Sequence, residues 1–241
     1  MSDISWLTSR PIAHRGYHDL NNKIWENTLS AFGRAIKKGY AIECDVHLSS
    51  DGVPVVFHDD GLKRLAGTDG YVWQRTAAEF GAMQIGGTAD HAPTLKEMLD
   101  FVAGRVPLVI ELKGTPGKDD GLVERVCTLL RAYEGQAAIM SFDHWLIREF
   151  PKHAEGIPAG LTAWGSEQHE LEAHFAMLGN GISFVSYAVD HLPNPFVSFV
   201  RGKLGMPVIT WTVRNDKAVA QTFEHADQMT FEGFEPEAAS V

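Results

Sequence analysis

Short apolar runs alternate with longer segments of helical periodicity along almost the whole chain. Repeated units of this kind predict parallel strands joined by right-handed helical crossovers. We expect eight main strands, at 11–16, 41–48, 107–113, 137–142, 158–163, 184–188, 207–213 and 228–231, with 54–58 as an extension of the second. We expect helices between them, at 26–38, 94–104, 120–133, 145–153, 167–178, 195–203 and 216–225.

Eight such units in 241 residues match the size of an α/β protein of the (β/α)₈ TIM-barrel class, which is the predicted fold. An open doubly wound sheet is the alternative, but no glycine-rich dinucleotide fingerprint follows the first strand. The segment at about 59–93 is rich in glycine and threonine, and we expect it to be an irregular insertion on the functional face. No repeat or linker divides the chain, so we predict one domain over residues 1–241.

Composition indicates which binding partners and which cellular compartment to expect. The net charge of −10 argues against a nucleic-acid-binding protein, because such proteins carry a basic surface. No apolar run is long enough to cross a bilayer, and the N-terminal residues lack the pattern of a secretory signal. Cys44 and Cys127 fall on apolar positions, so we expect two buried free thiols and a cytoplasmic protein. The sequence marks no interface, and a homo-oligomer stays open.

The stretch AIECDVHLSSDGVPVVFHDD, at 41–60, carries the first indication of chemistry. Side chains alternate between the faces of a strand, so Glu43 and Asp45 share one face and Ile42, Cys44 and Val46 share the other. Neighbouring carboxylates that are buried together need a cation, a shared proton or water. Mg²⁺ and Ca²⁺ prefer such oxygen ligands. The alternative is a pair of solvated charges on an open sheet face.

In TIM barrels the active site lies at the carboxyl ends of the strands. Polar or aromatic residues end several of the predicted strands, namely His14 and Arg15, His58, Glu111 and Lys113, and Trp211. Each has a structural alternative: a histidine at a strand end often makes only a structural hydrogen bond, and Glu111 with Lys113 could form a simple ion pair. Their convergence predicts carboxylates that hold a metal, cations that bind phosphate oxygens, and two histidines that act as acid and base.

Six segments occur in a fixed order, namely IAHRG, ENTLSAF, IECDVHLSSDGVPVVFHDDGLKR, PLVIELK, IMSFD and ITWTV. In this combination the chain resembles the glycerophosphodiester phosphodiesterase family. The resemblance implies a TIM barrel with one divalent cation, Mg²⁺ or Ca²⁺, held by Glu43, Asp45 and Glu111. It implies that His14 and His58 act as an acid–base pair and that Arg15 and Lys113 contact the phosphate. It also implies that Trp211 lines the site and that Glu26 and Asn27 support it.

The activity that the resemblance implies is metal-dependent hydrolysis of a small-molecule glycerophosphodiester to an alcohol and glycerol phosphate. Water or a hydroxyl of the substrate could be the nucleophile. The alternatives are a phospholipase of the same barrel type, either a lysophospholipase D or a lyase that forms a cyclic phosphate, and, in another class, a non-catalytic barrel that binds a phosphate metabolite. The last alternative would be expected to lack an acid, base or ligand, and none is missing here.

The sequence also departs from the family pattern. Leu65 and Ala66 follow Arg64 where the family usually has a threonine pair, and Ser49 stands where threonine is usual. The last strand continues as Thr-Phe-Glu-Gly-Phe, at 230–234, instead of Thr-Asp-x-Pro. The predicted catalytic positions are unaffected, so we expect these departures to alter substrate preference.

Overall fold

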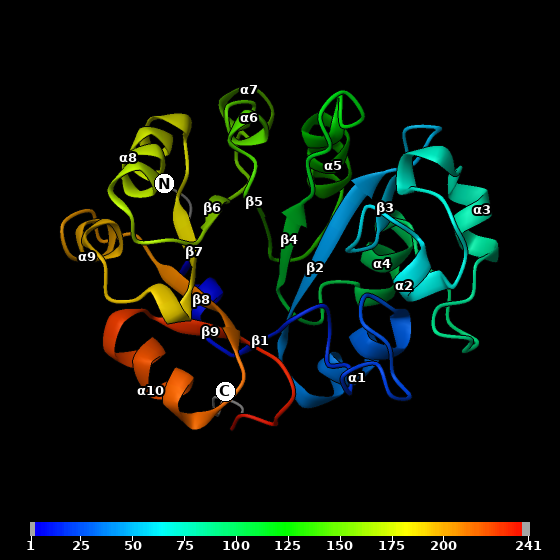
Figure 1. Cartoon of the computed structure of the whole chain (residues 1–241), viewed down its shortest axis with the longest axis horizontal. Helices are drawn as coiled ribbons and strands as arrows, with labels where there is room; N and C mark the ends of the chain where they lie inside the picture. Colours follow the sequence, from blue (N-terminus) through cyan, green and yellow to red (C-terminus); the bar gives the residue numbers. More distant parts are fainter. Residues whose placement is uncertain (1–2, 238–241) are drawn as a thin grey trace.

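The computed structural model describes residues 3–237. In this part of the chain eight parallel strands close into a barrel (Figure 1), which confirms the predicted fold class. In barrel order these are β1 (Ile12–Ala13), β2 (Ala41–Leu48), β4 (Leu108–Leu112), β5 (Ala137–Ser141), β6 (Ala159–Ala163), β7 (Phe184–Ala188), β8 (Val208–Val213) and β9 (Gln228–Phe231). Strand β1 pairs with both β2 and β9 and thereby completes the ring. The extension β3 (Pro54–Val56) pairs antiparallel with β2.

Helices lie outside the barrel between successive parallel strands (Figure 1), namely α1 (Leu29–Lys38), α4 (Leu95–Val102), α5 (Leu122–Arg131), α6 (His144–Ile147), α7 (Phe150–His153), α8 (Gln168–Met177), α9 (Pro195–Gly202) and α10 (Asp216–His225). The single helix predicted at 145–153 is wrong, because the chain forms α6 and α7 instead. Pro151 has no N–H to donate to the carbonyl four residues earlier, so a continuous helix would lose that bond. Within residues 3–237, no helix is long and apolar enough to cross a membrane.

The wall of the barrel has two different faces, as the alternation in β2 predicted. Ile42, Cys44 and Val46 point outward into the core between strands and helices. Ala41 and Val109 belong to a separate apolar cluster, which also includes Leu7 of the 3₁₀ helix η1 (Ser5–Thr8). Apolar side chains therefore fill the inside of the barrel at the level of Ala41. The polar side chains of β2 begin at the next position that points into the barrel. The cysteines, Cys44 and Cys127, are buried and free.

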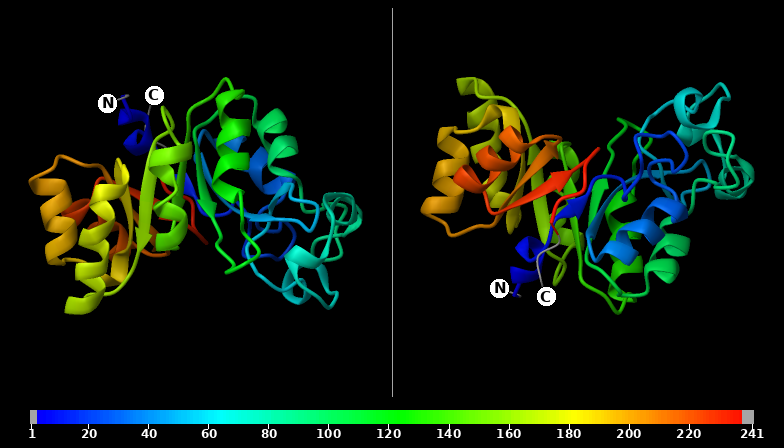
Figure 2. Two further views of the ribbon diagram at one scale, coloured as in Figure 1. Left: turned by 90° about the horizontal axis from the view of Figure 1, so that it is seen from above. Right: turned by 90° about the horizontal axis from the view of Figure 1, so that it is seen from below.

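The segment predicted to be irregular contains α2 (Lys63–Ala66), the 3₁₀ helix η2 (Val72–Gln74) and α3 (Ala77–Ala82). It projects to one side of the barrel (Figure 2). Phe57, Leu62 and Phe80 belong to a small apolar core beneath it. The expectation of irregular structure was therefore wrong for part of this segment, because a few buried apolar side chains stabilise short helices among its glycines.

Two element boundaries place residues of the site in loops. The first strand, predicted to run to residue 16, ends at Ala13, and the first helix begins at Leu29 rather than at residue 26. Arg15 and Asn27 have positive φ values of 54° and 56°, which neither a strand nor a right-handed helix can contain. The side chain of Thr28 caps the helix by accepting the N–H of Ala31.

Candidate active site

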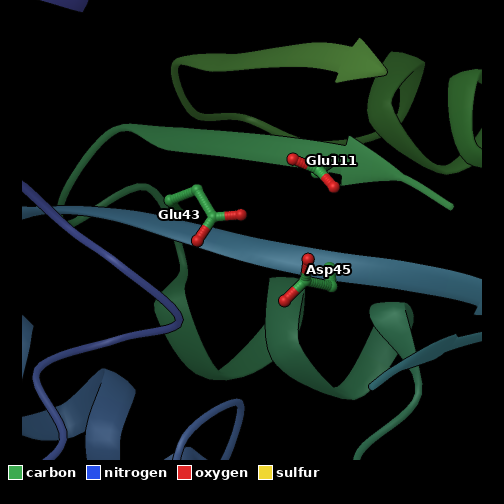
Figure 3. Close-up of side chains that lie close together, drawn as sticks. All are labelled: Glu43, Asp45 and Glu111. Atoms are coloured by element: carbon green, nitrogen blue, oxygen red, sulfur yellow. The ribbon is translucent and has the colours of Figure 1, made fainter. Parts of the chain in front are cut away.

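Three carboxylates meet inside the barrel near the carboxyl ends of its strands. Glu43 and Asp45 extend from β2, and Glu111 extends from β4 directly beside Asp45 in the strand register. Figure 3 shows the three side chains on the two neighbouring strands. One oxygen from each lies within 4.8 Å of the others, and all three side chains are buried. Burial and the neighbouring negative charges raise the pKa of Glu43 well above its usual value.

Two cations balance part of this charge. The ammonium of Lys113 lies 2.7 Å from Glu111 Oε1 and 3.5 Å from Asp45 Oδ1, so the simple Glu111–Lys113 pair is only part of the arrangement. Arg15 Nε lies 3.4 Å from Asp45 Oδ2, and its backbone N–H donates to Glu43 at 2.8 Å. Burial alone would raise the pKa of Asp45, but the charges of Lys113 and Arg15 help to hold it well below its usual value.

The two supporting residues orient this cluster from the loop after β1. The side chain of Asn27 donates to Asp45 Oδ2 at 2.8 Å, and its backbone N–H donates to the Arg15 carbonyl at 2.9 Å. Glu26 accepts hydrogen bonds from Arg15 at 2.7 Å and from both terminal nitrogens of Arg64 at 2.8 and 2.9 Å. Burial would raise the pKa of Glu26, but the bonds from Arg64 and the charge of Arg15 lower it to about 2.

Each predicted histidine is held by a carboxylate at the same ring nitrogen. His14 Nδ1 lies 2.6 Å from Glu232, and His58 Nδ1 lies 2.7 Å from Asp59. Burial lowers the pKa of both imidazoles, while these hydrogen bonds act in the opposite direction. A proton on Nδ1 donates to the carboxylate, so Nε2 is the nitrogen left to accept a proton or, when the imidazole is doubly protonated, to donate one. Glu232 also accepts from Arg214 Nε at 3.1 Å, which fixes its position further.

The three carboxylates, the two histidines and the cations Arg15 and Lys113 line one pocket of about 360 Å³. Its other wall comes from the later strands and includes Met140, Phe142 and Trp211. The indole Nε1 of Trp211 is buried and has no hydrogen-bond partner within residues 3–237. A larger hollow of about 790 Å³ lies beside the insertion but contains none of the three carboxylates. The chemistry is therefore concentrated at the barrel mouth.

Comparison with known sequences agrees with this geometry. Residues 14–234 match the glycerophosphoryl diester phosphodiesterase family. The chain belongs to this family. The predicted family is thereby confirmed, and the enzyme class that the family name describes is the predicted one, a phosphodiesterase.

Two curated relatives in this family illustrate its range. The chain is 34% identical over 160 residues to a glycerophosphodiester phosphodiesterase of Caldanaerobacter subterraneus, a match that covers 62% of this chain and 65% of that protein. It is 30% identical over 176 residues to a lysophospholipase D of Homo sapiens, covering 68% of this chain and 46% of that protein. The matches thus span between about half and two thirds of the length of these two relatives.

Solved structures of this family share the barrel. A glycerophosphodiester phosphodiesterase of Thermotoga maritima superposes with a TM-score of 0.71 at 26% identity, covering 91% of this chain and 92% of that one. A phosphodiesterase of Oleispira antarctica, solved with the product sn-glycerol-3-phosphate, gives a TM-score of 0.79 at 22% identity, with 92% of each chain covered.

Three residues had no role in the sequence analysis although they bind site residues. Asp59 binds His58, Glu232 binds His14 and Arg64 binds Glu26. Asp59 could have been found, because it directly follows His58. Glu232 lies 218 positions from His14 in the sequence, and only its place in the departure from the family pattern singled it out. Arg64 was noted only as the residue before a missing threonine pair, and its contact with Glu26 crosses 38 positions.

Proposed function

We propose that this chain is a metal-dependent phosphodiesterase that hydrolyses glycerophosphodiesters to an alcohol and glycerol phosphate. Family membership supports the reaction class. One observation carries the proposal: a single pocket is lined by two carboxylate-held histidines, three clustered carboxylates and, beside these, the cations Arg15 and Lys113. These are the groups that hydrolysis of a phosphodiester anion requires.

Glu43, Asp45 and Glu111 are proposed to hold one hard divalent cation, Mg²⁺ or Ca²⁺. Their fit rests on the donor set: three buried carboxylates, one oxygen of each lying within 4.8 Å of the others. Among residues 3–237, only the cations Arg15 and Lys113 form ion pairs with them. When bound, the ion would neutralise phosphate oxygens and stabilise the charge that develops at phosphorus.

Arg15 and Lys113 are proposed to bind the phosphate and orient it. Both line the pocket, and both are already held by carboxylates, so little freedom is lost when the substrate binds. The guanidinium of Arg15 has a planar fork that suits two phosphate oxygens. Trp211 closes the opposite wall, where its indole ring is proposed to pack against the substrate.

His14 and His58 are proposed to divide the proton transfers. His14, as the base, takes a proton from the attacking hydroxyl, and His58, as the acid, returns one to the departing alkoxide. The carboxylate at each Nδ1 leaves Nε2 for the substrate. We assign the acid to His58, and the activity of the two histidine variants on an aryl diester, whose leaving group needs no proton, tests this assignment.

Lysophospholipase D activity is a second candidate, and the human relative of that name favours it. A non-catalytic barrel is less well supported, since the predicted acid, base and ligands all line the pocket.

A product assay distinguishes these functions. A panel of glycerophosphodiesters and lysophospholipids is incubated with Mg²⁺, Ca²⁺ or Mn²⁺, and the products are followed by phosphorus NMR. We expect glycerol phosphate from the glycerophosphodiesters. A cyclic phosphate that accumulates would indicate a lyase in which the substrate hydroxyl attacks. The absence of turnover with every diester and metal would contradict the phosphodiesterase and favour a binding barrel.

The buried free thiols of Cys44 and Cys127 support a reducing compartment, and we propose the cytoplasm. Fractionation of cells that produce the protein tests this, and recovery outside the cytoplasmic fraction would contradict it.

A further inference from the structure

Three residues at the outer end of the pocket have no role in the proposed chemistry. Trp164 directly follows β6, while Asp190 and His191 belong to the 3₁₀ helix η4 (Val189–His191), which directly follows β7. Because β6 and β7 are neighbours in the barrel, both loops reach the mouth side by side. All three residues line the same pocket as the catalytic groups. We call these residues the outer shelf.

The outer shelf is held in place by its neighbours. The hydroxyl of Tyr187 donates to the carbonyl of Gly165 at 2.6 Å, which fixes the backbone just after Trp164. The side chain of Asn194 donates to the carbonyl of His191 at 3.0 Å. Trp164 is nevertheless 57% exposed, so a large indole is presented to the pocket on a fixed loop. Its ring meets that of His191 edge to face, with centroids 6.1 Å apart.

The outer shelf also carries an uncompensated negative charge. Asp190 has no ion pair and no side-chain hydrogen bond to any other residue in the range 3–237 that the structure covers. The nearby cation of the pocket rim, Arg214, is paired with Glu232 at 3.1 Å. At the inner end, by contrast, Arg15 and Lys113 provide positive charge for a phosphate. The pocket thus suits a substrate with an anion at one end and a cation at the other.

We propose that the outer shelf binds the ammonium head of the leaving alcohol, so that the preferred substrates are zwitterionic glycerophosphodiesters of choline or ethanolamine type. The indole face of Trp164 attracts the cation through its π-electrons, as aromatic side chains do for quaternary ammonium groups. The carboxylate of Asp190 adds direct charge attraction. His191 supports the indole from its edge. This assignment rests on the proposed phosphodiesterase function and names the alcohol that it releases.

The test compares glycerophosphocholine with its neutral isostere, in which carbon replaces the ammonium nitrogen, because the two diesters have the same shape. The readout is the ratio of their kcat/KM values for the wild type, Asp190→Asn, Trp164→Ala and Trp164→Phe. Two matched controls lie away from the pocket. Glu155→Gln removes an exposed carboxylate from the loop before β6, at the opposite end of the barrel, and Phe223→Ala removes an aromatic ring that is 52% exposed on α10.

We expect the wild type to favour the choline diester. Asp190→Asn and Trp164→Ala should each lower the ratio by about three- to tenfold, the range of one exposed cation–π or ion-pair contact. Trp164→Phe should lower it less, because a smaller π-face remains, and both controls should leave it unchanged. A wild type that hydrolyses both diesters equally fast, or a ratio unaffected by Asp190→Asn and Trp164→Ala, would overturn the inference while the phosphodiesterase function stands.

A wild type that hydrolyses neither diester would instead contradict the proposed function. Calorimetric titration of the protein with the two diesters still decides the role of the outer shelf in that case. Tighter binding of glycerophosphocholine that Asp190→Asn abolishes would support it, and equal affinities would overturn it.

Discussion

Arg15 and Asn27 turn the chain twice at the barrel mouth, with φ values of 54° and 56°. Such left-handed backbone costs a non-glycine residue about 1–2 kcal/mol. Site contacts offset the cost, because the backbone N–H of Arg15 donates to Glu43 and the side chain of Asn27 donates to Asp45. The sequence predicted that both residues belong to the site, but it placed Asn27 in a helix. Periodicity could not show a turn that only these distant partners stabilise.

His14 and His58 should each contribute to the rate through proton transfer. Loss of a general acid or base costs about 10²–10⁴ in rate, so His14→Ala and His58→Ala should each lower kcat on a glycerophosphodiester by about that factor. An aryl diester releases a leaving group that needs no proton. It should therefore restore most of the activity of His58→Ala and little of that of His14→Ala. Steady-state kinetics with both substrates measures this.

Metal affinity is the control for these two variants, and it should change little, since neither histidine is a proposed ligand. Rescue of His14→Ala alone would reverse the assigned roles. Near-normal kcat in both variants would rule out the two-histidine mechanism.

The pKa of Glu26 predicts a pH dependence of stability. Its pKa falls from an ordinary value of 4.5 to about 2 in the folded protein. The stabilisation is therefore fully present above about pH 4.5 and is lost as pH falls toward 2. Glu26→Gln should lower the free energy of unfolding by up to about 3 kcal/mol at pH 7 and by clearly less at pH 3. Urea unfolding at both pH values measures the difference, and a loss of equal size at each would contradict it.

At the scale of helices and strands, the sequence predicted the order of the elements because their periodicities are local properties. The sequence-based prediction failed where a local pattern was interrupted or where tertiary contacts determine the local structure. The helix predicted at 145–153 is interrupted at residues 148–149, and Pro151 stands in the first turn of the second piece, a helix-breaking residue whose effect the apolar spacing concealed. The insertion was expected to be irregular, yet buried contacts of Phe57 and Phe80 stabilise short helices in it. These contacts join residues 23 positions apart, which no local pattern reveals.

The attachment of the insertion to the site can be tested at Gly86. A Cβ added there would lie 1.9 Å from the ring of Trp25, whereas one at Gly87 would have no neighbour within 4 Å. Both glycines have positive φ, 59° and 68°, so alanine costs about 1–2 kcal/mol of backbone strain at either position. Gly86→Ala should destabilise the protein by about 1–3 kcal/mol more than Gly87→Ala, because the Trp25 ring must move.

Thermal unfolding and limited proteolysis of the two variants measure this difference. We expect faster cleavage between residues 60 and 92 in Gly86→Ala alone. Equal stability and equal cleavage of the two variants would show that the insertion is not held by the Trp25 contact.

At the scale of the whole molecule, barrel closure turns dispersed motifs into one site. Parallel strands bring their carboxyl ends to one rim, so residues from His14 to Trp211 line a single pocket. The sequence predicted this convergence because the topology follows from repeated units. It could not predict which loop residues would meet across the rim, such as Glu232 with His14, since closure alone brings them together. We propose that barrel and insertion form one folding domain, as the sequence indicates.

The same closure brings three carboxyl groups together inside the barrel, where a cation can bind them. A divalent cation that binds only the folded protein should stabilise it by about 2.7 kcal/mol at a hundredfold excess over its Kd. For a chain of this size that corresponds to a rise in Tm of about 5–10 °C. Chelation by EDTA should abolish activity, and Mg²⁺, Ca²⁺ or Mn²⁺ should restore it. Full activity in excess EDTA would contradict the metal site.

Glu43→Gln tests whether the Glu43 carboxylate binds the metal or only supports the fold. Burial and the charges of Asp45 and Glu111 disfavour an ionised Glu43, so a neutral amide relieves repulsion in the metal-free protein. Its Tm without metal should therefore equal or exceed that of the wild type, while the rise in Tm on adding metal should largely disappear. Glu155→Gln, which removes an exposed carboxylate outside the pocket, should keep the full rise. If Glu43→Gln keeps it too, the cation binds elsewhere, because a site that loses one of three buried carboxylates cannot hold the ion with unchanged affinity.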